Sequence, residues 1–204
     1  MRDWSLNSGE RSVETIRADH RFRYEWAYDR IPMGQGLDLF CGTGYGTRML
    51  SKEGHYVIGI DGSAEAIAFA RTHHKGLDFI QAEWPLSLNP DYDFIVSLES
   101  IEHVEDGFDM LRKMSTALRP EGSLIFSTPN EDIMSHEWMH NPFHFRHFHH
   151  DEILKFMEDI NMELKGWAGQ HVYLWDKSVI PNQYQVCKDL VPGQFHIYHY
   201  TKRA

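Results

Sequence analysis

The run LDLFCGTGYG, residues 37–46, decides the fold of this chain. Its apolar residues Leu37, Leu39 and Phe40 are typical of a buried parallel strand, and the chain then turns through glycines in the spacing G-x-G-x-G. Glycine permits positive φ and lets the backbone approach a ligand closely. These glycines are Gly42, Gly44 and Gly46. Residues 45–53 predict a helix whose N-terminus faces the turn, so the segment predicts a strand that leads into a nucleotide-binding turn.

A second apolar run, residues 56–60, ends in Asp61. A carboxylate at the tip of the second strand suits the two hydroxyls of a ribose. The dinucleotide fingerprint is G-x-G-x-x-G, whereas here the third glycine comes one residue earlier and Asp38 precedes the turn. The two segments therefore indicate a nucleoside cofactor without a phosphate and with a cationic end.

At these residues the chain resembles the class I S-adenosylmethionine-dependent methyltransferases, whose first motif is an acidic residue, then G-x-G-x-G, then a strand with an acidic end. The resemblance continues in order, with residues 79–83 similar to the third strand, 92–97 to the fourth and 118–127 to the fifth. It implies S-adenosylmethionine as cofactor, with Glu83 in a position more often occupied by Asp at the adenine amine and Trp84 beside the adenine. The full set of expected cofactor residues is Tyr24, Asp38, Gly42, Gly44, Gly46, Asp61, Glu83, Trp84 and Leu98.

Strands alternate with helical segments along the whole chain, which predicts an α/β fold with a doubly wound, mostly parallel sheet and helices on both faces. The resemblance implies seven strands. With 204 residues, 42% of them hydrophobic, the chain is long enough for one core, so we expect a single domain over residues 1–204. Helices are expected near 24–31, 63–70, 106–118 and 151–160, and the last strands at 162–169 and 195–200. Residues 171–192 predict no element.

The composition of the chain indicates its cellular compartment and the classes of partner that it can bind. No apolar stretch has the length of a membrane span or the form of a signal peptide, and the two cysteines lack metal-type spacing, which fits a soluble protein of the reducing cytoplasm. The formal net charge of −10 at pH 7 disfavours nucleic acid, whose phosphates require a basic surface. A small-molecule or glycan-like acceptor is therefore expected, and the oligomeric state is not predicted.

Residues 1–33 are expected to form an N-terminal helical cover over the cofactor. Within it, His20 to Ala27 is similar to an H-x-x-R-Y-x-x-A helix of a bacterial methyltransferase subgroup, whose later segments appear here as S-I-E-H (100–103), S-T-P-N (127–130) and N-P-F-H (141–144). Arg21 and Arg23 are expected to meet the carboxylate of the cofactor. The alternative for Arg23 and Tyr24 is a role in helix packing only.

The segment Leu98 to His103 follows the fourth strand, where doubly wound sheets open their crevice. Methyl transfer to a hydroxyl needs a base or a metal, whereas an amine needs only its lone pair. His103 is the candidate base and Glu102 its catalytic neighbour, and the alternative is that both residues are structural. The spacing E-x-x-E-H resembles the metal-binding segment of ubiquinone-biosynthesis and small-RNA 2′-O-methyltransferases. The resemblance implies a divalent cation (Mg, Mn, Fe or Zn) bound by Glu99, Glu102, His103 and His144.

Residues 136–150 hold six histidines, a density that a solvated loop does not require. We expect one or two of these imidazoles to reach the site as a ligand, a base or a substrate contact, with His144 favoured over His140 and His147. The alternative is a polar loop anchored by aromatic side chains.

Three functions are compatible with these features. The first is an S-adenosylmethionine-dependent O-methyltransferase that acts on a hydroxyl with metal or histidine assistance. The second is a metal-independent N- or C-methyltransferase, and the third a non-catalytic S-adenosylmethionine-binding module. The intact glycines, Asp61 and the polar group after the fourth strand argue against the third function.

Overall fold

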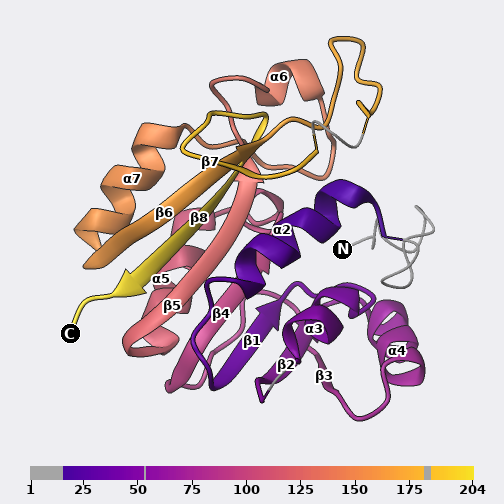
Figure 1. Cartoon of the computed structure of the whole chain (residues 1–204), viewed down its shortest axis with the longest axis vertical. Helices are drawn as coiled ribbons and strands as arrows, with labels where there is room; N and C mark the ends of the chain where they lie inside the picture. Colours follow the sequence, from indigo (N-terminus) through magenta and orange to yellow (C-terminus); the bar gives the residue numbers. More distant parts are fainter. Residues whose placement is uncertain (1–15, 53, 182–184) are drawn as a thin grey trace.

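An eight-stranded sheet with helices on both faces organises the chain (Figure 1). The computed structural model describes residues 16–52, 54–181 and 185–204, so most of the first half of the predicted cover lies outside the described residues. The strands are β1 (Gln35–Leu39), β2 (Tyr56–Asp61), β3 (Asp78–Gln81), β4 (Tyr92–Leu98), β5 (Leu118–Pro129), β6 (Met162–Gln170), β7 (Lys188–Asp189) and β8 (Phe195–Lys202). The helices described are α2 (Ala18–Tyr28), α3 (Tyr45–Leu50), α4 (Ala64–His73), α5 (Gly107–Ala117), α6 (His136–Met139) and α7 (His150–Asp159), with a 3-10 turn η1 at Ile101–His103.

The strand order is β3-β2-β1-β4-β5-β8-β6-β7, with parallel pairing from β3 through β5 and antiparallel pairing around β8. The chain builds outward from β1 to β3 and then returns to place β4 on the other side of β1. Doubly wound sheets bind ligands where the strand order reverses in this way, outside the carboxyl ends of the strands. The mostly parallel sheet is as predicted, but it has eight strands rather than seven, because two residues of the segment 171–192 pair with β6 as β7.

Two hydrophobic cores lie on the two faces of the sheet. Because side chains alternate along a strand, Leu37 and Leu39 of β1 face the core that α5 and α7 cover. Phe94 and Val96 of β4 face the opposite core, which α2 and α3 cover. Figure 1 shows α2 lying across β1 and β4, the two strands that flank the reversal point.

Most predicted helices are present with shifted ends. The helix predicted over 45–53 is described only to Leu50, and the one near 24–31 ends at Tyr28, before the proline and glycine that follow. Helix α6 was not predicted, because four residues carry too little periodic pattern to be recognised. Among the described residues, no helix combines the length and the apolar composition that crossing a bilayer requires.

At Gly44 and Gly46, side chains from other elements fill the space that a Cβ would take. A Cβ on Gly46 would lie 2.0 Å from the Tyr24 ring of α2, and one on Gly44 would lie 2.7 Å from the Phe79 ring. Gly44 also has φ of 83°, which side chains rarely adopt. The missing side chains at these two positions thus make room for α2 and β3, and the expected contact of Gly44 and Gly46 with the cofactor stays a prediction.

The buried carboxyl of Asp38 links β1 to α2 and α3. Asp38 of β1 is fully buried, accepts a hydrogen bond from the Tyr24 hydroxyl at 3.1 Å and accepts another from Thr47 Oγ1 of α3 at 2.7 Å. Burial, together with the negative charge of Asp61, raises the pKa of Asp38 to about 7, although both hydrogen bonds oppose the rise. Asp38 therefore fixes α2 and α3 against β1 and lies behind the turn.

Replacing Gly46 with Ala should destabilise the fold, although alanine is the better helix former. The gain in helix propensity is about 1 kcal/mol, whereas overpacking costs about 1–3 kcal/mol and the buried Tyr24 ring is held by Asp38. We expect a net loss of free energy of unfolding, measured by urea denaturation. The control is Gly166→Ala, where a Cβ meets nothing within 4 Å. Equal stability of the two variants would show that Tyr24 moves freely.

The stability of the fold should decrease with pH because of Asp38. Its folded-state pKa of about 7 exceeds the unfolded value, so the native state binds the proton more tightly and loses stability as the pH rises from about 4 to about 7. Asp38→Asn keeps an oxygen for Tyr24 and an N–H for Thr47, and it should remove up to about 4 kcal/mol of this dependence. Urea titrations at about pH 5 and pH 8 measure it, with the exposed Asp29→Asn as control. Parallel pH profiles for the wild type and Asp38→Asn would contradict the assignment.

Candidate active site

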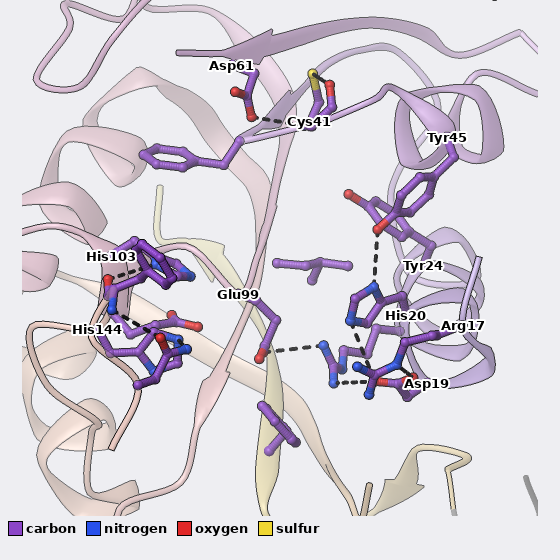
Figure 2. Close-up of a pocket in the computed structure, with 18 of the residues that line it drawn as sticks. Arg17, Asp19, His20, Tyr24, Cys41, Tyr45, Asp61, Glu99, His103 and His144 are labelled. Carbon is purple, nitrogen blue, oxygen red and sulfur yellow. Dashed lines mark hydrogen bonds and ion pairs between the residues drawn. The ribbon is translucent and has the colours of Figure 1, made fainter. Parts of the chain in front are cut away.

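A cavity of about 300 Å³ opens at the carboxyl ends of β1 and β4 (Figure 2). A smaller cavity of about 100 Å³ adjoins it, and Phe40 and Asp61 line both. The residues of the large cavity that matter here come from α2, the glycine turn, the end of β4, η1 and the loop after β5. They are Arg17, His20, Arg23, Tyr24, Gly42, Asp61, Leu98, Glu99, Glu102, His103, Asn141 and His144.

Asp61 lies where the two cavities meet. Its carboxylate accepts hydrogen bonds from the backbone N–H of Gly42 at 2.9 Å and of Ser63 at 2.8 Å, so it is fixed at the tip of β2. Glu83 and Trp84 line the smaller cavity on the β3 side. Asp61, Glu83 and Trp84 thus line the smaller cavity together, and their contacts with a ribose and an adenine stay a prediction.

Six of the nine predicted cofactor residues line a cavity, and three do not. Gly42, Tyr24 and Leu98 line the large cavity. The three that line neither cavity are Asp38, Gly44 and Gly46. Their packing against α2, α3 and β3 supports the turn from behind, which sequence spacing alone does not distinguish from contact with a ligand.

Arg23 is a buried cation on the α2 side of the large cavity. Its Nε donates to Gln170 Oε1 at 2.7 Å, and its guanidinium lies 3.3 Å from Asp19 and 3.6 Å from Glu99. These neighbouring carboxylates raise the pKa of Arg23 although burial lowers it. Arg21, which was expected to act with Arg23, instead pairs with Glu25 on the exposed face of α2.

Arg17 was not singled out as a site residue, yet it lines the same cavity. It donates two hydrogen bonds of 3.0 Å to the carboxylate of Asp19. Asp19 is itself 1% exposed and lies four residues before Arg23. This i, i+4 spacing of opposite charges was the signal in the sequence that could have placed Arg23 in a paired, buried position.

Glu99 follows β4 in a left-handed backbone conformation, with φ of 51°. Its backbone N–H donates to Ser127 at the end of β5, and its Oε1 accepts from Ser127 Oγ at 2.7 Å. The same oxygen faces Arg23. Glu99 therefore lies apart from the other predicted metal ligands and is paired with a cation of the protein.

Glu102 has no hydrogen-bond partner for either carboxylate oxygen within the described part of the chain, although it is completely buried. Burial, followed by the negative charge of Glu99, raises the pKa of Glu102 well above its usual range. The ligand atoms of Glu102, His103 and His144 lie within 4.8 Å of one another. We call these three residues the Glu–His–His cluster. A buried carboxyl without a partner is costly, so this position suits a proton or a cation.

The imidazole of His103 presents one unprotonated nitrogen. Its Nδ1 lies 3.0 Å from the Phe143 carbonyl, which can only accept, so Nδ1 carries the proton and Nε2 holds a lone pair. Burial lowers the pKa of His103, which keeps the ring neutral near pH 7. A neutral imidazole with a free Nε2 can act as a base or as a metal ligand.

His144 belongs to a chain of neutral histidines. The Met134 carbonyl fixes the proton on Nδ1 of His147, so His147 Nε2 accepts from His144 Nδ1 at 2.8 Å. His144 Nε2 then accepts from the amide of Asn141 at 2.8 Å, whose orientation is set because its Oδ1 accepts from the Phe143 N–H. Burial and the neighbouring imidazoles lower the pKa of His144 to about 3.

Of the six histidines in residues 136–150, only His144 lines the cavity. His147 supports it from the buried side, and His140 is exposed at the end of α6. His136 donates to the carbonyl of His144, and His149 pairs with Asp132 at the start of α7. The expectation that His144 leads this group agrees with its position, whereas the others stabilise the loop.

Comparison with known proteins gives consistent results. Residues 17–172 match a family model described as "Methyltransferase domain". A protein of Mycobacterium tuberculosis named as a probable S-adenosylmethionine-dependent methyltransferase is 29% identical over 163 residues, which cover 74% of this chain. The match spans only 59% of the length of that relative. A ubiquinone biosynthesis O-methyltransferase of Aliivibrio fischeri is 29% identical over 159 residues, 66% of each chain.

Solved structures show the same fold at low sequence identity. A chain from a complex of the Haloferax volcanii Trm112 methyltransferase activator with a methyltransferase superposes with a TM-score of 0.75 at 18% identity, over 100% of both chains. An S-adenosylmethionine-dependent methyltransferase of Mesorhizobium loti gives a TM-score of 0.71 at 18% identity, over 91% of this chain and 100% of its own. At this identity the likeness concerns the fold alone.

Proposed function

Because this chain belongs to the class I S-adenosylmethionine-dependent methyltransferase family, we propose that it methylates a hydroxyl group of a small-molecule or glycan-like acceptor with the help of a divalent cation. The observation that carries the proposal is the buried, unpartnered Glu102 carboxyl beside two neutral imidazoles at the cavity. An amine acceptor would need no such group, since its own lone pair is the nucleophile. The O-methyltransferase names among the relatives support the same acceptor chemistry.

The two cavities offer complementary contacts for S-adenosylmethionine. Asp61 is placed for the ribose hydroxyls, and Glu83 and Trp84 for the adenine in the smaller cavity. Arg23 supplies the buried positive charge that the carboxylate of the cofactor requires, on the α2 side of the large cavity.

The Glu–His–His cluster fits a divalent cation by its donors. One carboxylate and two neutral imidazoles form a mixed O/N set that suits Mn, Fe or Zn, and Mg less well. Glu102 offers two oxygens that nothing else binds, and His103 offers Nε2. His144 would bind the cation through Nε2, because its Nδ1 proton is already donated to His147. The Asn141 amide, which donates to that Nε2, would then have to give up its hydrogen bond. When bound, the cation lowers the pKa of the acceptor hydroxyl.

The protein contributes mainly position and proton transfer. Methyl transfer is an in-line displacement, so holding the acceptor oxygen in line is the main source of rate. Glu102 and the two imidazoles hold that oxygen on the η1 side. The single lone pair of His103 Nε2 can serve one role at a time. It would bind the cation, which lowers the pKa of the acceptor hydroxyl so that its proton leaves to solvent, or, without a cation, it would take that proton itself. The aromatic and thioether side chains of Phe143, Met134 and Met139 limit the water around it.

Replacing Asp61 with Ala should weaken S-adenosylhomocysteine binding by about 1.5–3 kcal/mol, since a charged acceptor for two hydroxyls is removed. The loss of its bonds to Gly42 and Ser63 adds to the effect through the turn. Calorimetry measures it, with the exposed Glu65→Ala as control. Binding of NAD without binding of S-adenosylhomocysteine by the wild type would contradict the cofactor assignment.

Metal removal by EDTA and substitution of cluster residues together distinguish a metal-assisted reaction from one in which His103 acts as the general base. With an acceptor that is turned over, EDTA should abolish activity and Mn²⁺ should restore it. Glu102→Gln and His103→Ala should each reduce kcat at least about 100-fold, the lower range for one acid–base group, while S-adenosylhomocysteine binding persists.

The exposed His171→Ala serves as the control for an imidazole outside the cavity. Turnover that resists EDTA but is lost in His103→Ala would remove the cation from the mechanism and leave His103 as a general base. If both changes leave turnover intact, the cluster is structural and the acceptor is an amine or a carbon, as in the second function considered above.

A further inference from the structure

Glu99 lies between two sites that both compete for its charge. On one side is Arg23, 3.6 Å away, and on the other is the Glu–His–His cluster. We propose that Glu99 is a shared carboxylate that couples the two ligands: the carboxylate of the cofactor displaces Glu99 from Arg23, and Glu99 then completes the cation site. This inference rests on the proposed function and adds to it an order of assembly.

The position of Glu99 supports a side chain that changes partner. Figure 2 shows Glu99 between His103 and His144 on one side and Arg17 and Asp19 on the other. Its backbone is fixed by the N–H bonds to Ser127, and its carboxylate accepts one further hydrogen bond, from Ser127 Oγ at 2.7 Å, while the side chain is 22% exposed. Rotation of the side chain can therefore exchange one partner for the other.

The charges around Arg23 explain why the exchange is favourable. Arg23 is 2% exposed and already faces the carboxylates of Asp19 and Glu99. Arg17 shares Asp19 with Arg23, so a third carboxylate from the cofactor would set three negative charges against two cations, and an uncompensated buried charge is costly. Movement of Glu99 to a divalent cation removes one of these charges and supplies the fourth protein ligand that the sequence predicts.

The coupling works in both directions. A cation that attracts Glu99 leaves Arg23 with Asp19 as its remaining carboxylate, so the affinity of Arg23 for the carboxylate of the cofactor increases. Thermodynamic linkage requires the cofactor to increase the affinity for the cation by the same factor. If Glu99 instead bound the ammonium group of the cofactor, the cation would compete for it, and the coupling would have the opposite sign.

Calorimetry on the whole chain tests the sign and the size of the coupling. S-adenosylhomocysteine is titrated into chelator-treated protein with and without saturating Mn²⁺, and its neutral sulfur avoids repulsion from the cation. We expect Mn²⁺ to tighten binding about 10-fold, within the usual range of allosteric coupling. Free Mn²⁺ measured by electron paramagnetic resonance should show the same factor when S-adenosylhomocysteine is added. In Glu99→Gln both ligands should still bind, with a coupling factor near one.

Two further variants test whether the coupling depends on Glu99 itself. Glu158→Gln makes the same change on the exposed face of α7 and should retain the full coupling. Glu99→Ala gives a second test if the amide of Glu99→Gln disturbs the hydrogen bond from Ser127. Independent binding of the two ligands by the wild type, antagonism between them, or coupling that survives in both Glu99 variants would overturn the inference while the proposed function stands. Absence of Mn²⁺ binding would remove both the inference and the metal-assisted reaction.

Discussion

The contact between Tyr24 and the glycine turn determines where the cationic side chains of α2 lie in the cavity. The ring of Tyr24 fills the space that a side chain at Gly46 would take, and its hydroxyl bonds to the buried Asp38. This seats α2 across the point where the strand order reverses. Arg23 is the next residue toward the N-terminus, and only with α2 in this place can it reach both Gln170 and Glu99. A packing contact thus sets the electrostatics of the site.

The cavity concentrates opposite charges in a chain that is acidic overall. The α2 side holds Arg17 and Arg23, which are paired with carboxylates, while the η1 side holds a carboxyl without a partner and neutral imidazoles. Such an arrangement is unfavourable for the empty protein, because buried polar groups without partners cost free energy. Under the proposed function, a cation on the η1 side would give the Glu102 carboxyl a partner and so offset this cost. The free energy lost by these buried groups would be regained when ligands bind beside them, which is typical of sites that are organised before the ligand arrives.

The sequence predicted the parts of this site whose chemistry is local. The turn, Asp61 and the strands around them follow from short patterns in which neighbouring residues share one role. A second requirement for Gly44 and Gly46 could not be predicted, because the rings that fill the space of their missing side chains belong to Phe79 and Tyr24, which are distant in sequence. Glu99 was grouped with Glu102 and His103 by spacing, whereas its partner lies on α2. Long-range pairing of this kind leaves no mark on the spacing of a motif.

The acceptor side shows why the histidine-rich loop was difficult to interpret. The backbone of one residue, Phe143, orients both imidazoles of the Glu–His–His cluster: its carbonyl accepts from His103, and its N–H holds Asn141 against His144. The side chain of Phe143 is 45% exposed and could be exchanged without loss of either bond. Backbone groups are the same in every residue, so sequence shows that imidazoles are present but not which of them is held in place. The tautomers that make His103 and His144 available follow from two carbonyls, those of Phe143 and Met134, and hence from the path of the loop rather than from the identity of its residues.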